Sequence, residues 1–315
     1  MKMSQLILNF FKQPGTFGLE VKPVGHCNYE DHIEYKGKKP RELLQLSNAR
    51  KKNLPSYTKK MKQMLRDVTA ITKIENTAPM SFCWSIDKKQ FLSTSLFFEY
   101  YMATLSCALQ NLGEAMRKEK GTKQLYKDAK ASLIHLLGMF DEWKTQHLIL
   151  PDVPYVVTPM FIRSMLCLAH GCHSLHISHA FTGKAAVVGF YTAMQSFGEV
   201  WPRYPYGNMA FHQYLVSRVL LYDSLAKTLE DSNKKITCLK EVEALLPYIK
   251  FQECYLSQEI LELMKTIEND NAGNIHDLEN THYAVAETLN DIELPQGYKL
   301  AVCRKTGLFG CKCKE

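Results

Sequence analysis

Between Phe97 and Leu112 the chain reads FFEYYMATLSCALQNL, and this stretch decides the fold class. Its apolar residues are spread around most of the circumference of a helix, so a single apolar face does not account for them. A helix that is apolar on nearly all sides is buried by its neighbours. We therefore predict a long central helix over residues 90–120, surrounded by other helices.

Helical periodicity continues on both sides of this central helix. Upstream, Ser56 is a suitable N-cap for a helix that reaches residue 74. Downstream, breaks rich in Gly, Pro, Asn, Asp or Ser separate apolar segments at residues 123–146, 160–181, 183–201, 208–230, 235–246 and 252–269. Helices joined by short turns are typical of an α-solenoid. We predict a mainly all-α, elongated fold with a tetratricopeptide-like solenoid core.

The two ends of the chain differ from this helical part. Residues 1–39 contain scattered Gly, Pro and Asn around short alternating segments at 17–21 and 33–35, which predict a small N-terminal β element. Residues 301–315 are basic and contain cysteines, and we interpret them as an exposed tail. We expect one helical domain over residues 1–300. Reversible acylation of Cys311 or Cys313 is an alternative to an unmodified tail.

The composition is that of an ordinary globular protein. Apolar residues make up 46% of the chain and charged residues 23%, which excludes a disordered chain. The net charge of +7 is modest for this length, so we expect no nucleic-acid partner. No run of about 18 apolar residues is present to span a membrane, and cysteines inside apolar runs suit a reducing compartment. We therefore predict a cytoplasmic protein that acts as a monomer.

Basic residues are concentrated in the N-terminal quarter of the chain. They are Lys36, Lys38, Lys39, Arg41, Arg50, Lys51, Lys52, Lys59, Lys60, Lys62 and Arg66. A solvated helix face explains such a cluster. Peripheral contact with an anionic membrane or with an acidic partner is the alternative.

The sequence contains no recognised catalytic motif. GxSxG, the Walker A loop and GxGxxG are all absent, so we expect neither an enzyme nor a cofactor. The densest set of chemically active side chains is the run His170-Gly-Cys-His-Ser-Leu-His-Ile-Ser-His179, in which helical spacing aligns pairs of histidines. A metal site in this run is one hypothesis. A polar stripe between helices is the other.

Several stretches resemble the BRO-type domain of the Alix and BROX family. Ser81-Phe-Cys-Trp84 is similar to a short family strand that carries an aromatic residue, any residue and Trp. Residues 127–140 resemble a family helix whose exposed lysine holds the partner, and Lys127 falls at that lysine. Residues 185–201 resemble the helix that supplies an apolar pocket. Ala185 and Gly189 depart from the family pattern, because they replace two large aliphatic residues of that pocket.

The resemblance implies a non-enzymatic adaptor that binds the C-terminal amphipathic helix of an ESCRT-III subunit, in endosomal sorting or membrane remodelling. Apolar anchors of that helix would enter a groove, and lysines at its rim would meet acidic side chains. The implied partner-binding residues are Lys127, Lys130, Val187, Val188, Phe190 and Tyr191. A tetratricopeptide-like scaffold unrelated to ESCRT, and a metal-binding protein built on the histidine run, are the alternatives.

Overall fold

The computed structural model describes residues 21–25, 48–50, 55–60, 81–118, 121–143, 154–178, 180–200, 207–251, 262, 264–270, 302–303 and 308–309. These residues belong to two compact units. The first unit ends at Ala169, and the second contains the described residues from His170 onward. The boundary falls inside one helix, α8 (Pro159–Ser178). The single domain expected over residues 1–300 stays a prediction.

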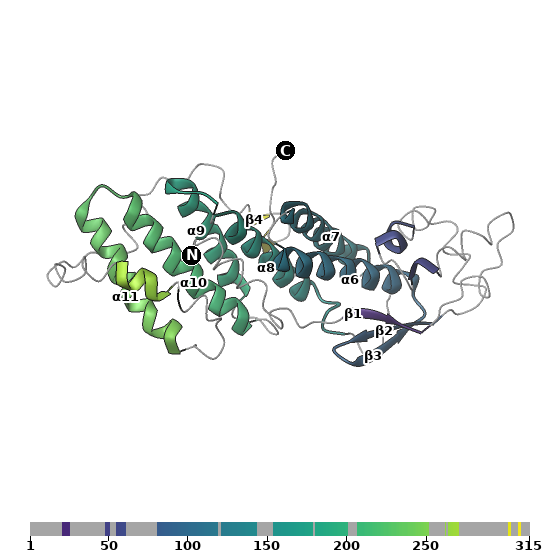
Figure 1. Cartoon of the computed structure of the whole chain (residues 1–315). Coiled ribbons are helices and arrows are strands. Elements are labelled where there is room, and N and C mark those ends of the chain that lie inside the picture. Colours follow the sequence, from purple (N-terminus) through teal and green to yellow (C-terminus); the bar gives the residue numbers. More distant parts are fainter. Residues whose placement is uncertain are drawn as a thin grey trace. The chain divides into compact units, whose positions relative to one another are not determined.

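The first unit contains a three-stranded antiparallel sheet in the order β1-β2-β3. The strands are β1 (Val21–Val24), β2 (Phe82–Ile86) and β3 (Lys89–Ser93) (Figure 1). Asp87 and Lys88 connect β2 to β3 with φ angles of 47° and 71°. Two successive positive φ angles define the tight hairpin turn whose twist matches that of the strands. The sheet confirms the predicted β element, and its first strand lies in the N-terminal region.

The central helix of this unit is α6 (Leu96–Arg117), which is buried as predicted. Tyr101, Met102 and Leu105 are all 0% exposed. The predicted start at residue 90 was wrong, because residues 90–93 pair with β2. Ser95 is the N-cap, and its side chain accepts a hydrogen bond from the Phe98 N–H, which satisfies one of the amides left without a helical partner at the helix start.

Helix α7 (Thr122–Trp143) packs against α6. Gly121 precedes it with a φ of 72°, a left-handed conformation that glycine adopts without strain. The Tyr100 hydroxyl lies 2.9 Å from His135 Nε2 on α7. The Tyr101 hydroxyl donates to the Val156 carbonyl at 2.9 Å, which ties the segment after α7 to the central helix. The helix predicted over residues 123–146 is confirmed as far as Trp143, and residues 144–146 lie outside the described residues.

The second unit contains α9 (Gly183–Val200), α10 (Gly207–Thr228) and α11 (Ser232–Phe251), together with the C-terminal half of α8. Helix α10 packs against both α9 and α11. Arg218 on α10 donates to Glu241 on α11 at 2.9 Å. The end predicted at residue 246 for the helix over 235–246 was wrong, because α11 continues through Pro247. Residues 264–270 are helical as predicted, whereas 252–261 lie outside the described residues.

Most described elements are therefore helices, which confirms the predicted fold class. In the tail, β4 (Val302–Cys303) and β5 (Leu308–Phe309) pair antiparallel. Cys311 and Cys313 lie outside the described residues, as do the segment at 33–35 and most of the basic N-terminal cluster. Among the helices that the structure describes, none has the length and apolarity that a membrane span needs.

Buried cysteines lead to the first testable prediction. Cys107, Cys172 and Cys238 are buried free thiols, and burial raises the pKa of each; for Cys238, with Glu241 as a second cause, the pKa rises to about 11. Since the thiolate is the reactive form, these side chains should resist iodoacetamide at pH 8 in the native state and react in urea. Mass spectrometry of the alkylated peptides measures this. Labelling of all three without denaturant would contradict their placement in the core.

Candidate partner-binding site

A buried polar cluster fixes the sheet of the first unit against α6. Glu99 on α6 accepts hydrogen bonds from three side chains that belong to different segments: Trp84 Nε1 at 2.5 Å, the Tyr57 hydroxyl at 2.6 Å and Arg50 Nε at 2.7 Å. Glu99, Trp84 and Tyr57 are 0% exposed, and Arg50 is 3% exposed. We call these four residues the Glu99 cluster.

Arg50 extends this cluster to the backbone of the sheet. Its guanidinium donates to the Cys83 carbonyl at 3.3 Å and to the Gly25 carbonyl at 3.4 Å. It also lies over the Trp84 ring, 5.7 Å from the ring centre. Each buried charge is thus paired and further hydrogen-bonded, the condition under which burial of an ion pair is tolerated. The cluster is a structural clamp that sets the position of α6 and of α7 packed on it.

Helix α7 presents a basic and apolar stripe to solvent. Lys127, Ala131, Ile134 and Gly138 recur at helical spacing, and all four are exposed. Ile134 is 48% exposed, a large value for an aliphatic side chain. Lys130 is half-buried beside this stripe. We call the four exposed residues and Lys130 the α7 face.

The opposite side of α7 is the packed side. Tyr126, Ala129, Leu133 and Leu136 are all 0% exposed. The helix is therefore amphipathic, and the orientation that buries these residues leaves the α7 face outside. Sequence reasoning placed Lys127 and Lys130 on a partner-binding surface but missed Ile134. Its position seven residues after Lys127, two turns along one face, was the available signal.

The residues predicted on α9 are mostly in the core. Val187, Val188 and Phe190 are 3%, 7% and 3% exposed, whereas Tyr191 is half-buried. By helical spacing, Val187 and Val188 both lie one turn before Tyr191, and all three of Val187, Val188 and Phe190 are buried. Of this predicted set, Tyr191 is the residue that reaches solvent, with Val188 next to it. Their contact with a partner stays a prediction.

Gly189 and Ala185 have different surroundings. A Cβ built on Gly189 would overlap Ser178 Oγ, so α8 and α9 approach closely at this point. The Ser178 hydroxyl is held there by a hydrogen bond to the Ser174 carbonyl at 2.5 Å. Ala185, in contrast, is exposed at the start of α9. The departure at Gly189 therefore reflects helix packing, which leaves no room there for a large aliphatic side chain, whereas nothing in the structure explains the departure at Ala185.

The histidine run lies on α8 and continues past its end. His170 and His173 are half-buried and His176 is buried, whereas His179 lies outside the described residues. Within the part of the chain that the structure describes, no group of three or more His, Cys, Asp or Glu side chains converges to hold a metal ion. The metal site and the polar stripe both stay hypotheses for this run.

Comparison with known proteins places the fold in a class. No protein-family model matches the chain, and no curated protein sequence matches it significantly. Among solved structures, the chain is similar to one described as the ALIX BRO1 CHMP4C complex, with a TM-score of 0.56 and 13% sequence identity over 84% of this chain and 90% of that one. At this identity the likeness shows a BRO1-like fold.

Proposed function

We propose that this protein is a non-enzymatic adaptor whose α7 face binds the C-terminal amphipathic helix of an ESCRT-III subunit. The observation that carries the proposal is the exposed Ile134 two turns from Lys127 on a helix whose opposite side is fully buried. The likeness to a BRO1 domain solved together with CHMP4C supports the same kind of partner. The proposed setting is the cytoplasmic side of endosomal or other membranes.

The chemistry of the α7 face fits an amphipathic acidic helix. Ile134 offers an apolar contact, and the small residues Ala131 and Gly138 on either side of it let a partner backbone approach closely. Lys127 and Lys130 lie toward the N-terminal end of the face and would meet carboxylates of the partner. Apolar anchors with a charged rim are the usual organisation of helix-in-groove recognition. Tyr191 on α9 is proposed as a separate contact, which a substitution of Tyr191 would test.

Charge reversal on the α7 face should weaken binding. In a fluorescence titration with a labelled CHMP4C C-terminal helix, Lys127→Asp should raise Kd at least about tenfold, because it removes an attraction and adds a repulsion. The effect should shrink at high salt, since exposed charges are screened. Lys265→Asp is the matched control, since Lys265 is also an exposed helical lysine.

The controls decide how a negative result is interpreted. Both variants should keep wild-type helical content, because both lysines are exposed. Equal affinities for wild type and Lys127→Asp would remove the α7 face from the interface. Absence of binding by the wild-type chain to any ESCRT-III helix would leave the BRO1-like fold in place and favour a scaffold with a different partner.

A further inference from the structure

Among the residues that the structure describes, the sheet of the first unit has one closed edge and one open edge. At the β1 edge, Pro23 opposes Trp84 and has no backbone N–H to offer to another strand. Ser106 on α6 donates to the Val21 carbonyl at 2.6 Å, which occupies an acceptor of the same strand. Helix α6 packs against β1. A further strand therefore has no ladder to join on this side.

The β3 edge is the open one. In a hairpin closed by a two-residue turn, Ile86 and Lys89 form the first hydrogen-bonded pair, so the pairs alternate from there along the register. Gln90 and Leu92 occupy the positions whose backbone N–H and C=O groups point away from β2. Among the described residues, no hydrogen bond reaches the backbone of either one from outside the hairpin. These groups are the template on which another strand can pair.

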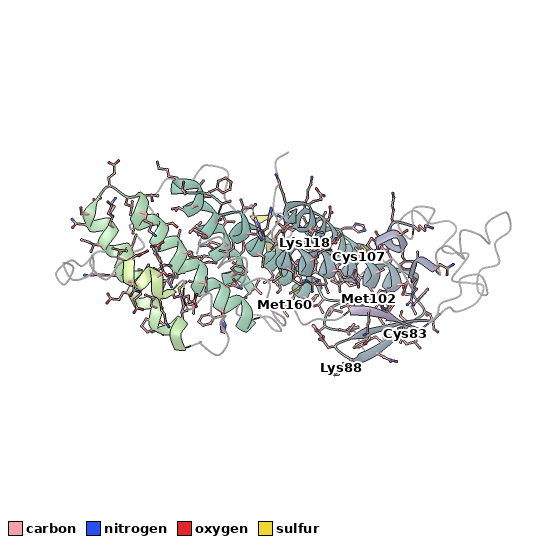
Figure 2. The ribbon with its side chains drawn as sticks, in the orientation of Figure 1. Cys83, Lys88, Met102, Cys107, Lys118 and Met160 are labelled. Atoms are coloured by element: carbon pink, nitrogen blue, oxygen red, sulfur yellow. The ribbon has the colours of Figure 1, made fainter. Side chains whose placement is uncertain are left out.

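The side chains beside this edge are apolar or basic. Leu92 is 63% exposed. It faces Cys83 across the hairpin, and Cys83 in turn faces Val24, so an apolar row crosses the side of the sheet opposite Trp84 and ends at the open edge. Lys88 and Lys89 are exposed at the turn, and Figure 2 shows Lys88 at the tip of the hairpin.

The charges select the kind of strand that fits. The chain has no Asp or Glu between Lys88 and Phe98, and the nearest carboxylate, Asp87, accepts a hydrogen bond from the Tyr155 hydroxyl at 2.6 Å. A second copy of this edge would bring Lys88 and Lys89 against the single carboxylate of Asp87, a net positive charge, whereas an acidic strand would supply opposite charge. Lysines on an edge strand oppose self-pairing and leave pairing with an acidic segment favourable.

We propose that β3 is a second docking site, which takes an extended acidic peptide with alternating apolar residues as a fourth strand of the sheet. The peptide backbone pairs with Gln90 and Leu92, one of its apolar side chains continues the row that ends at Leu92, and its carboxylates meet Lys88 and Lys89. This site shares no residue with the α7 face, and it stands or falls independently of the ESCRT-III proposal.

The test uses fluorescence polarisation of a labelled nine-residue peptide in which valine and glutamate alternate, titrated with the full chain. We expect saturable binding, and at least about tenfold weaker binding of the same peptide with lysine in place of glutamate. Leu92→Pro removes an N–H that points away from β2, so it should keep the hairpin and weaken binding about tenfold. Leu92→Thr keeps the N–H and should weaken binding less.

Two further measurements keep the outcome decisive. Two peptides, each N-methylated at one of the two sets of alternate amides, remove the same hydrogen bonds without altering the protein. Only the peptide whose methylated amides would face β3 should bind about tenfold more weakly. Lys127→Asp should leave this binding unchanged. Wild-type affinity in Leu92→Pro, or equal binding of both methylated peptides, would overturn the proposal. If the chain bound phosphatidylserine vesicles but not the peptide, and Lys88→Glu abolished the binding to vesicles, this surface would instead be assigned to a membrane.

Discussion

Replacement of Glu99 by Ala should lower the free energy of unfolding of the first unit by about 3–5 kcal/mol, because it leaves Arg50 as an uncompensated buried charge. The same change removes the acceptor of the Trp84 indole and of the Tyr57 hydroxyl, both of which are fully buried. Urea denaturation followed by tryptophan fluorescence measures the loss.

Tyr57→Phe is the graded control for this prediction. It removes one donor to Glu99 and leaves Arg50 and Trp84 in place, so the expected loss is only about 1 kcal/mol. Because the chain forms two compact units, the tryptophan signal should be compared with helical content to detect separate transitions. A Glu99→Ala protein with the wild-type urea midpoint would show that the Glu99 cluster does not clamp the sheet to α6.

Replacement of Gly189 by Leu should have the second large effect. The new Cβ would overlap Ser178 Oγ, with the Ser178 Cβ also close by at 2.8 Å. Helices α8 and α9 would have to separate, so we expect a loss of about 3 kcal/mol or more, at the upper end of the range for overpacking. Thermal unfolding followed by circular dichroism measures it. This leucine would restore the residue type of the family pocket, so the prediction also tests why the chain departs there.

Gly138→Ala is the matched control, since it also adds a side chain to a helical glycine. A Cβ at Gly138 would have no atom within 4 Å, and this residue lies on the exposed α7 face. The higher helix propensity of alanine should raise stability by about 0.5–1 kcal/mol. If Gly189→Leu were as stable as wild type, the close approach of α8 and α9 would be refuted.

The helices were predictable from sequence because their periodicity and their breaks are strong. Helix α9 begins at Gly183 as predicted, and α6 is buried on all sides from Phe98 to Leu109, where its apolar residues are densest, whereas Gln110 and Arg117 are exposed. The start of α6 was missed because Lys88 is not a usual residue at a turn position with positive φ, although Asp87 is. The end of α11 was missed because a proline inside a helix normally ends it, and Pro247 does not.

The candidate site was predictable only in part. Lys127 could be placed on the outside of α7 because lysine is rarely buried. Val187 and Phe190 could not be distinguished from surface anchors, since an apolar residue on an amphipathic helix fits a core and a docking groove equally well. The Glu99 cluster was not predictable at all, because Arg50, Tyr57, Trp84 and Glu99 are separated along the chain and no local spacing links them.

The most direct test of the α7 face uses a photoreactive benzoylphenylalanine at position 134. With a CHMP4C C-terminal helix present, irradiation should crosslink the helix to this position, and Lys127→Asp should reduce the yield. The same group at position 248 is the control, because Tyr248 is 65% exposed on α11 and belongs to neither proposed contact. Equal crosslinking from both positions, or crosslinking from position 248 alone, would contradict an ESCRT-III helix bound on α7.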